Sequence, residues 1–161
     1  MTFAPPTISE TSWHESHHAA SLCLDGLTPL VVRTDWPTAT LAGTVRPDWE
    51  THDIHEDTMR RLLVATLMGP ISEGERVYLH VAWPIDPADW NDACQADARQ
   101  LAFVCQWLGI DLADYLKFVF AADKRAKDPL FRRLVVEIAG LERDEMVLQP
   151  ELQALTDEVT R

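Results

Sequence analysis

The sequence predicts a mostly helical α+β fold with a small sheet or hairpin, and three observations support this. Apolar residues recur at helical spacing in several segments, most clearly over 57–69 and 90–108. Two short stretches, 28–34 and 38–45, are rich in β-branched residues and bounded by turn residues. With 161 residues, 47% of them hydrophobic, the chain can bury a core of its own. We therefore expect residues 1–161 to form a single domain.

The first helix is expected between Thr7 and Gly26. Thr7 and Glu10 have the spacing of a capping box, and Gly26 is a typical C-terminal stop. The stretches 28–34 and 38–45 follow as strands, which could pair as an antiparallel hairpin or form the edge of a small sheet.

A second helix is predicted over 57–69, with Pro70 and Gly74 closing it. Residues 76–83 have the composition of a short strand. Asp86 and Pro87 then form a strong helix start, since aspartate caps well and proline suits the first turn. This third helix is expected to end at Gly109. One seam along it is apolar except at Asp97 and comprises Trp90, Cys94, Asp97, Leu101, Val104 and Leu108.

Three more helices are predicted at 112–122, 129–141 and 150–159. Their apolar residues are expected to fill the core rather than to meet another subunit; they include Val119, Phe120, Phe131, Leu134 and Ile138. We interpret Cys94 and Cys105, three turns apart on the third helix, as core thiols rather than as metal ligands.

The charge excludes two classes of partner. Fourteen Lys and Arg face 26 Asp and Glu, a net charge of −12, so we expect neither nucleic acid nor an anionic membrane surface to bind. No apolar run is long enough to span a bilayer, and the first residues do not resemble a secretion signal. Three cysteines, an odd number, fit a reducing compartment. The expected location is cytoplasmic.

Five of the six histidines lie in the first 55 residues, and three of them form the motif Trp13-His-Glu-Ser-His-His18. On a helix, His14 and His18 project from the same face and can bind one metal ion. Glu15 then lies beside that ion and can take a proton from a metal-activated water. This pattern predicts a zinc site with Glu15 as the catalytic residue. We interpret His17 as a neighbour of the site, although it could substitute as a ligand.

A catalytic zinc needs a third protein ligand, and the acidic candidates are Asp86, Asp89, Asp92 and Asp97. Asp86 is needed as a helix cap, and Asp89 suits the positive end of the helix dipole. Asp92 is explained least well by capping, so we predict it as the ligand, with Asp89 in reserve. A second cluster around His52 and His55 more closely fits a solvated helix start than a second metal site.

The order of three motifs resembles the peptidase domain of FtsH-type (M41-like) zinc metalloproteases. These motifs are the His-Glu-x-x-His segment, the stretch Leu67-Met-Gly-Pro-Ile-Ser-Glu73 and the stretch Asn91-Asp92-Ala-Cys-Gln-Ala96. The resemblance covers about 11–108, which would hold the metal site, and extends to the helical part at about 111–161 only in kind. It implies a zincin-like fold, zinc ligands His14, His18 and Asp92, and an orienting role for Glu73.

The chain departs from that family in two ways. Ser16 and His17 stand where the family has small residues, and the 161 residues contain no phosphate-binding loop of an ATPase. We therefore expect a zinc-dependent peptidase that cleaves flexible or unfolded protein segments. Whether it works with a separate ATPase or as a homo-oligomer is left open. The alternative is a catalytically silent peptidase fold that acts as a zinc-stabilised binding or structural module.

Overall fold

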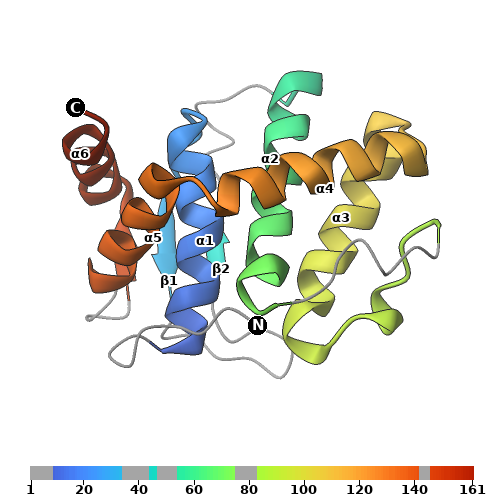
Figure 1. Cartoon of the computed structure of the whole chain (residues 1–161), viewed down its shortest axis with the longest axis horizontal. Coiled ribbons are helices and arrows are strands. Elements are labelled where there is room, and N and C mark those ends of the chain that lie inside the picture. The colour runs from blue at the N-terminus through green and yellow to red at the C-terminus, as the bar shows by residue number, and fades with distance from the viewer. Residues whose placement is uncertain (1–8, 34–43, 47–53, 75–82, 142–145) are drawn as a thin grey trace.

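The computed structural model describes residues 9–33, 44–46, 54–74, 83–141 and 146–161 of the chain (Figure 1). The helices are α1 (Glu10–Leu24), α2 (Glu56–Ser72), α3 (Gln95–Leu108), α4 (Leu112–Ala126), α5 (Pro129–Leu141) and α6 (Gln149–Thr160). Two 3-10 turns, η1 (Pro87–Asp89) and η2 (Asp92–Cys94), precede α3. The strands are β1 (Val31–Arg33), β2 (Thr44–Arg46) and β3 (Met146–Leu148). The predicted class, mostly helical α+β with a small sheet, is confirmed.

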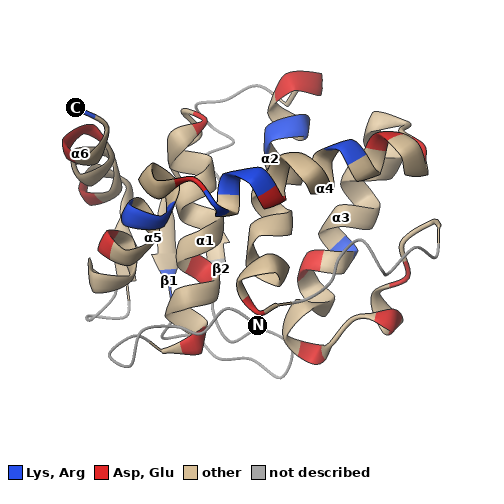
Figure 2. Ribbon diagram, in the orientation of Figure 1, with Lys and Arg blue, Asp and Glu red and all other residues tan. Residues whose placement is uncertain are grey.

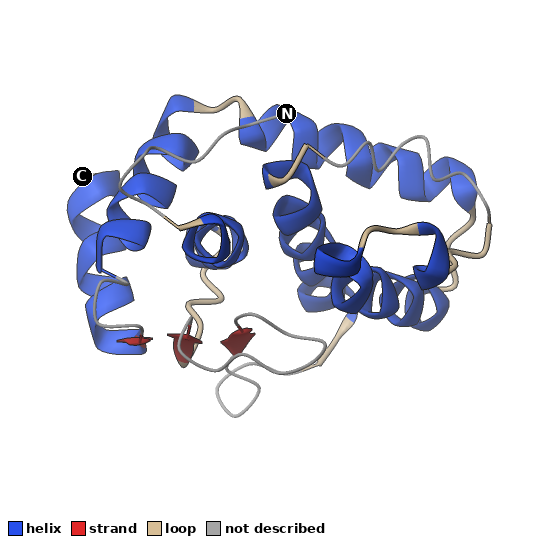
Figure 3. Cartoon of the chain, turned by 90° about the horizontal axis from the view of Figure 1, so that it is seen from below, coloured by secondary structure: helices blue, strands red, loops and turns tan. Residues whose placement is uncertain are grey.

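Helix α1 lies at the centre of the described structure. It packs most extensively against α2 and α5 and also contacts α6, β1 and β2. Figure 3 shows it end-on, with the sheet on one side and helices around the rest. Small side chains such as Ser16, Ala19 and Ala20 are buried along it and allow these neighbours to approach closely. A helix enclosed on several sides needs no single apolar stripe, which explains the irregular apolar pattern of this segment.

The sheet has the order β2-β1-β3, and both pairs are antiparallel. Val32 at its centre is fully buried and lies opposite Val45 on β2 and Val147 on β3. Antiparallel pairing, one of the two arrangements expected for 28–34 and 38–45, is therefore confirmed for β1 and β2, while residues 34–43 lie outside the described residues. The sequence did not predict β3, which is only three residues long and directly precedes α6. Of the predicted strand at 76–83, residues 76–82 lie outside the described residues.

Helix α1 begins two residues later than predicted. The hydroxyl of Ser9, not Thr7, caps it by accepting a hydrogen bond from the backbone N–H of Ser12 at 3.1 Å. Glu10 is then the first helical residue, so the predicted capping box is wrong, and Thr7 itself lies outside the described residues. The C-terminal stop is confirmed, since Gly26 has a φ of +75°, which favours glycine.

Three further helix boundaries were predicted wrongly. Helix α4, expected over 112–122, continues to Ala126. Helix α2 continues through Pro70 to Ser72, because a proline in the last turn removes only one backbone hydrogen bond. The single helix expected from Pro87 to Gly109 is divided, since Trp90 has extended backbone angles and Asn91 caps a second turn. Its regular part, α3, therefore starts only at Gln95.

The helices after α3 supply much of the core, and α5 has the predicted bounds. Of the five apolar residues expected there, Val119, Phe131, Leu134 and Ile138 are buried, whereas Phe120 is 68% exposed. Cys94 and Cys105 are buried, as predicted for core thiols. Within the described residues, no helix has both the length and the apolar character needed to cross a membrane.

Candidate metal centre

The two motif histidines meet side by side on the buried face of α1. His14 and His18 are four residues apart, and their ring centroids are separated by 4.8 Å. Their Nε2 atoms lie 3.1 Å from each other. Both residues are less than 10% exposed. The helical spacing read from the sequence thus places two imidazole nitrogens at one point inside the molecule.

The carboxylate that meets these nitrogens belongs to Asp97 on α3. Its Oδ2 lies 2.9 Å from Nε2 of His14, and its Oδ1 lies 3.2 Å from Nε2 of His18. Ligand atoms about 2.0–2.1 Å from a tetrahedral zinc are about 3.3 Å apart. The three separations in this cluster are within a few tenths of an ångström of that value. His14, His18 and Asp97 are therefore a donor set that fits zinc.

The outer nitrogen of each ring has its own partner. Nδ1 of His14 lies 2.6 Å from Oε1 of Glu73, which follows directly after α2, and Nδ1 of His18 lies 2.7 Å from the backbone carbonyl oxygen of Ala65. When each Nδ1 donates its hydrogen to such an acceptor, the lone pair is on Nε2. Glu73 thus contacts one of the two motif histidines, while the orienting role that the resemblance implies for it stays a prediction.

Helix α2 can approach this cluster only because it has a glycine there. A Cβ atom on Gly69 would lie 2.3 Å from Nε2 of His18 and 2.5 Å from Nε2 of His14. No side chain larger than hydrogen fits beside the two imidazoles without displacing them. Gly69 therefore sets the space around the Nε2 atoms.

Glu15 is buried next to the same cluster. It is 8% exposed, and burial raises the pKa of its carboxyl, while the charges of His18 and His14 act in the opposite direction. A buried carboxylate with a raised pKa holds a transferred proton more readily than an exposed one.

The protein's own charges stabilise the cluster. Burial disfavours the charged form of Asp97, but the neighbouring His18 and His14 outweigh it and lower the pKa of Asp97 to about 2. Burial likewise disfavours protonated His14, yet its hydrogen bonds to Asp97 and Glu73 raise its pKa to about 10. The pKa of His18 is raised in the same way, chiefly by the charge of Asp97 against the effect of burial. The environment therefore favours positive charge between the carboxylates.

Asp92, the predicted third ligand, lies outside the cluster. It is exposed in the turn η2, where its Oδ1 lies 3.5 Å from the side-chain amide nitrogen of Gln95. The reserve candidate Asp89 ends η1, also at the surface. The structure places Asp97 beside the histidines instead, in the first turn of α3. One sequence signal pointed to it: Asp97 is the single acid on the apolar seam.

The remaining histidines of interest have other roles. His17 is buried against Trp13 and Phe131, and its Nδ1 lies 2.7 Å from the carbonyl oxygen of Trp13. Burial lowers the pKa of His17 to about 4, so it is neutral at physiological pH. It is a packing neighbour and not a member of the donor set. His55 caps α2, as the interpretation of a helix start implied, and His52 lies outside the described residues.

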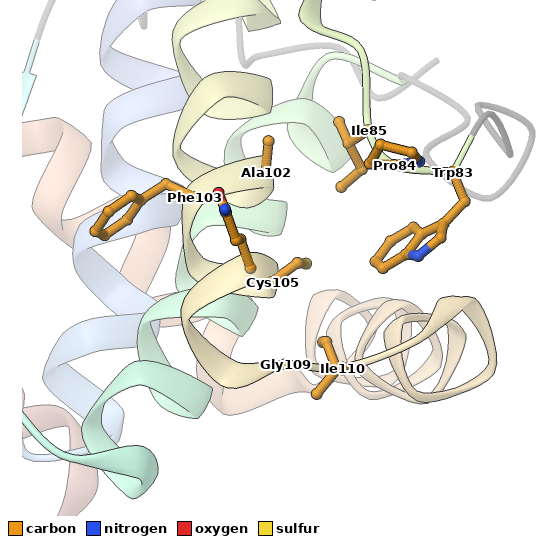
Figure 4. Close-up of a pocket in the computed structure, with 9 residues that line it drawn as sticks. Trp83, Pro84, Ile85, Ala102, Phe103, Cys105, Gly109 and Ile110 are labelled. Carbon is orange, nitrogen blue, oxygen red and sulfur yellow. The ribbon is translucent and has the colours of Figure 1, made fainter.

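A separate hollow of about 740 Å³ lies between α3, the connection that follows it and the segment around Pro84 (Figure 4). Figure 4 shows Trp83 and Ile85 on one side and Cys105 of α3 on the other. The α3 residues that line it lie five to nine positions after Asp97, and none of its described lining residues belongs to the histidine cluster. This hollow is not part of the metal centre.

Comparisons with protein-family models, with characterised proteins and with solved structures found no match to this chain.

Proposed function

We propose that the protein is a zinc-dependent peptidase with a zincin-like site, in which His14, His18 and Asp97 bind the metal. One observation carries the proposal. The Nε2 atoms of both histidines and the carboxylate of Asp97 converge within 3.2 Å of one another. Glu15 follows the first of these histidines, as the His-Glu-x-x-His pattern requires. The contact of Glu73 with His14 supports the resemblance to FtsH-type peptidases.

Each residue of the centre then has a chemical task. Zinc, when bound, supplies a Lewis acid that polarises the carbonyl group to be cleaved and lowers the pKa of water toward ~7. The carboxylate of Glu15 accepts a proton from the attacking water and passes it to the nitrogen of the leaving amine. Glu73 and the carbonyl of Ala65 hold the two rings in place, so that they do not rotate during the reaction.

The proposed substrates are flexible or unfolded protein segments. An extended segment can join a sheet edge through main-chain hydrogen bonds, with no need for a folded partner. In the described part of the sheet, β2 is an edge strand that pairs with β1, and both contact the helix that carries the histidines. We propose that the substrate lies along the β2 side of the sheet.

One observation favours the second candidate, a binding or structural module without turnover. Both ring nitrogens of His14 lie within hydrogen-bond distance of carboxylates, so the cluster satisfies its polar groups even as a set of ion pairs. A buried network of this kind can serve packing alone. Measuring metal content and cleavage together separates the two candidates.

The test compares Glu15→Gln with Glu10→Gln, a control on the exposed first turn of the same helix. Purified proteins are analysed for zinc and incubated with unfolded casein. We expect the wild type and both variants to carry about one zinc per chain at this centre. Cleavage by Glu15→Gln should fall by about 10²–10⁴-fold, the usual loss on removing a general base, while Glu10→Gln stays active.

Two results would contradict the peptidase proposal. Unchanged cleavage in Glu15→Gln would remove the role assigned to this carboxylate. Zinc at full occupancy in the wild type, without cleavage of any unfolded substrate, would favour the module.

A further inference from the structure

A second group of metal-binding side chains lies on the outer side of His14. Glu73 has one carboxylate oxygen, Oε1, 2.6 Å from Nδ1 of His14 and the other, Oε2, 3.8 Å from Sγ of Cys94. One ligand atom from each of these three residues lies within 4.8 Å of the others. His14 and Cys94 are buried, and Glu73 is partly exposed. Three elements converge here: α1, the end of α2 and the turn before α3.

We propose that Nδ1 of His14, the carboxylate of Glu73 and Sγ of Cys94 form a second metal site, for a thiophilic divalent ion such as Zn²⁺, Co²⁺ or Cd²⁺. Imidazole, carboxylate and thiolate are all ligands of such ions, and the thiolate selects against Mg²⁺ and Ca²⁺. The site shares His14 with the first centre, one ion on each ring nitrogen. This proposal rests on the proposed function in one respect, since it takes the first ion to be bound at Nε2 of His14. It does not depend on peptidase activity.

Two of the three pairs of ligand atoms can be compared with a bound site, and the third, Nδ1 of His14 and Sγ of Cys94, lies within 4.8 Å. In a tetrahedral zinc site a thiolate sulfur and a carboxylate oxygen are about 3.6 Å apart, close to the 3.8 Å between Cys94 and Glu73. The nitrogen and oxygen of His14 and Glu73 must separate from 2.6 Å to about 3.3 Å, as an ion replaces the hydrogen between them. The side chain of Glu73 is 26% exposed, which gives the ion a route from solvent.

Geometry makes this site the weaker of the two. An ion there displaces the thiol hydrogen of Cys94 and the Nδ1 hydrogen of His14, and both protons leave to solvent. The ligand atoms of the first centre already lie near their bound separations, whereas those of His14 and Glu73 must first move apart. The two sites therefore fill in order, with His14, His18 and Asp97 first.

A metal ion in the second site weakens metal binding at the first centre. The second ion takes Glu73 away from its hydrogen bond with His14, and loss of such an outer partner weakens a metal site by about 10–100-fold. A second cation on the same imidazole also repels the first. Excess metal should therefore weaken binding at the first centre, and Cys94 is the residue through which it does so.

The experiment is a titration of the metal-free chain with Co²⁺, followed by its visible d–d bands and by the near-ultraviolet charge-transfer band specific to cobalt–thiolate bonds. We expect two steps, with the d–d bands first and the thiolate band only in the second. Cys94→Ser should bind one ion and lack the thiolate band. Cys105→Ser and Cys23→Ser, which alter the other two buried thiols, should keep both steps.

Asp97→Asn completes the design, because it damages the first centre and leaves the three proposed ligands intact. The thiolate band should persist in this variant, and circular dichroism checks that each variant is folded. A single binding step without a thiolate band in the wild type would overturn the proposal, as would a thiolate band that survives in folded Cys94→Ser. The peptidase proposal is independent of these outcomes, since its own test is the Glu15→Gln comparison.

Discussion

His14 is the residue on which the whole site depends, because both of its ring nitrogens are engaged. Nε2 faces His18 and Asp97, and Nδ1 faces Glu73. A histidine used on one side only could be replaced by another donor of similar reach. Here the ring must be held from both sides at once, which requires helices α1, α2 and α3 to be packed correctly.

The choice between Asp97 and Asp92 gives the prediction at the residue scale. Asp97→Asn removes a charged oxygen 2.9 Å from His14 and should weaken zinc binding by more than about 100-fold, since even the loss of an outer partner costs 10–100-fold. Asp92→Asn, a matched change at an exposed position five residues earlier, should leave the affinity unchanged. Competition with a chromophoric chelator measures both. Equal losses of zinc affinity in the two variants, or a loss confined to Asp92→Asn, would contradict this choice and favour Asp92, the ligand predicted from the sequence.

At the scale of elements, α2 matters as much to the centre as the helix that carries the histidines. It supplies Gly69 where the rings need room, and it ends just before Glu73, where His14 needs an acceptor. The carbonyl of Ala65, one turn before Gly69, holds His18. One face of α2 thus shapes and orients the site without contributing a ligand.

The glycine on α2 gives the prediction at this scale. In Gly69→Ala the added methyl group would overlap two buried imidazoles, so we expect a loss of about 1–3 kcal/mol in the free energy of unfolding, together with loss of metal binding. Gly140→Ala in α5 is the matched control, because a Cβ there meets no atom within 4 Å. Alanine is the better helix former, so the control should be more stable by up to about 1 kcal/mol. Chemical denaturation measures both, and a Gly69→Ala protein as stable as the control would show that the rings have room to move.

The helix α3 shows how much of the site was predictable from the sequence. The spacing of Leu101, Val104 and Leu108 predicted the helix and its buried face correctly, because apolar periodicity persists through packing. The start was placed too early, because aspartate and proline at 86–87 open a 3-10 turn as readily as an α-helix. That error favoured Asp92, whereas the buried-face pattern already included Asp97. Apolar periodicity was therefore a more reliable guide to the buried face of α3 than the capping residues were.

At the scale of the whole molecule, acidic and basic side chains are distributed differently over the helices. Figure 2 shows Asp and Glu spread over most of the described elements, with basic residues concentrated where α4 meets α5. One of these, Arg125, binds both carboxylate oxygens of Asp25 at 2.7 and 2.8 Å and thereby ties the end of α4 to the end of α1. This contact helps to fix the histidine helix within the molecule.

Elements with a long sequence pattern were identified correctly. An element with a short pattern was missed. The helical segments were identified because each carries several turns of pattern, and α5 has its predicted bounds. The strand β3 has three residues, too few for a period-two pattern to stand out. The convergence of α1, the end of α2 and α3 on one point depends on tertiary packing. Sequence spacing within α1 therefore gave the two histidines, but not the carboxylate that joins them.

Anomalous X-ray diffraction from crystals of the zinc-loaded protein, recorded on both sides of the zinc absorption edge, tests the central claim most directly. The proposed centre predicts one strong peak within bonding distance of Nε2 of His14, Nε2 of His18 and a carboxylate oxygen of Asp97, at about 2.0–2.2 Å. A weaker peak beside Cys94 at high zinc would be the second site. A chain whose zinc lies at Asp92, or that shows no peak between the two histidines, would contradict the account.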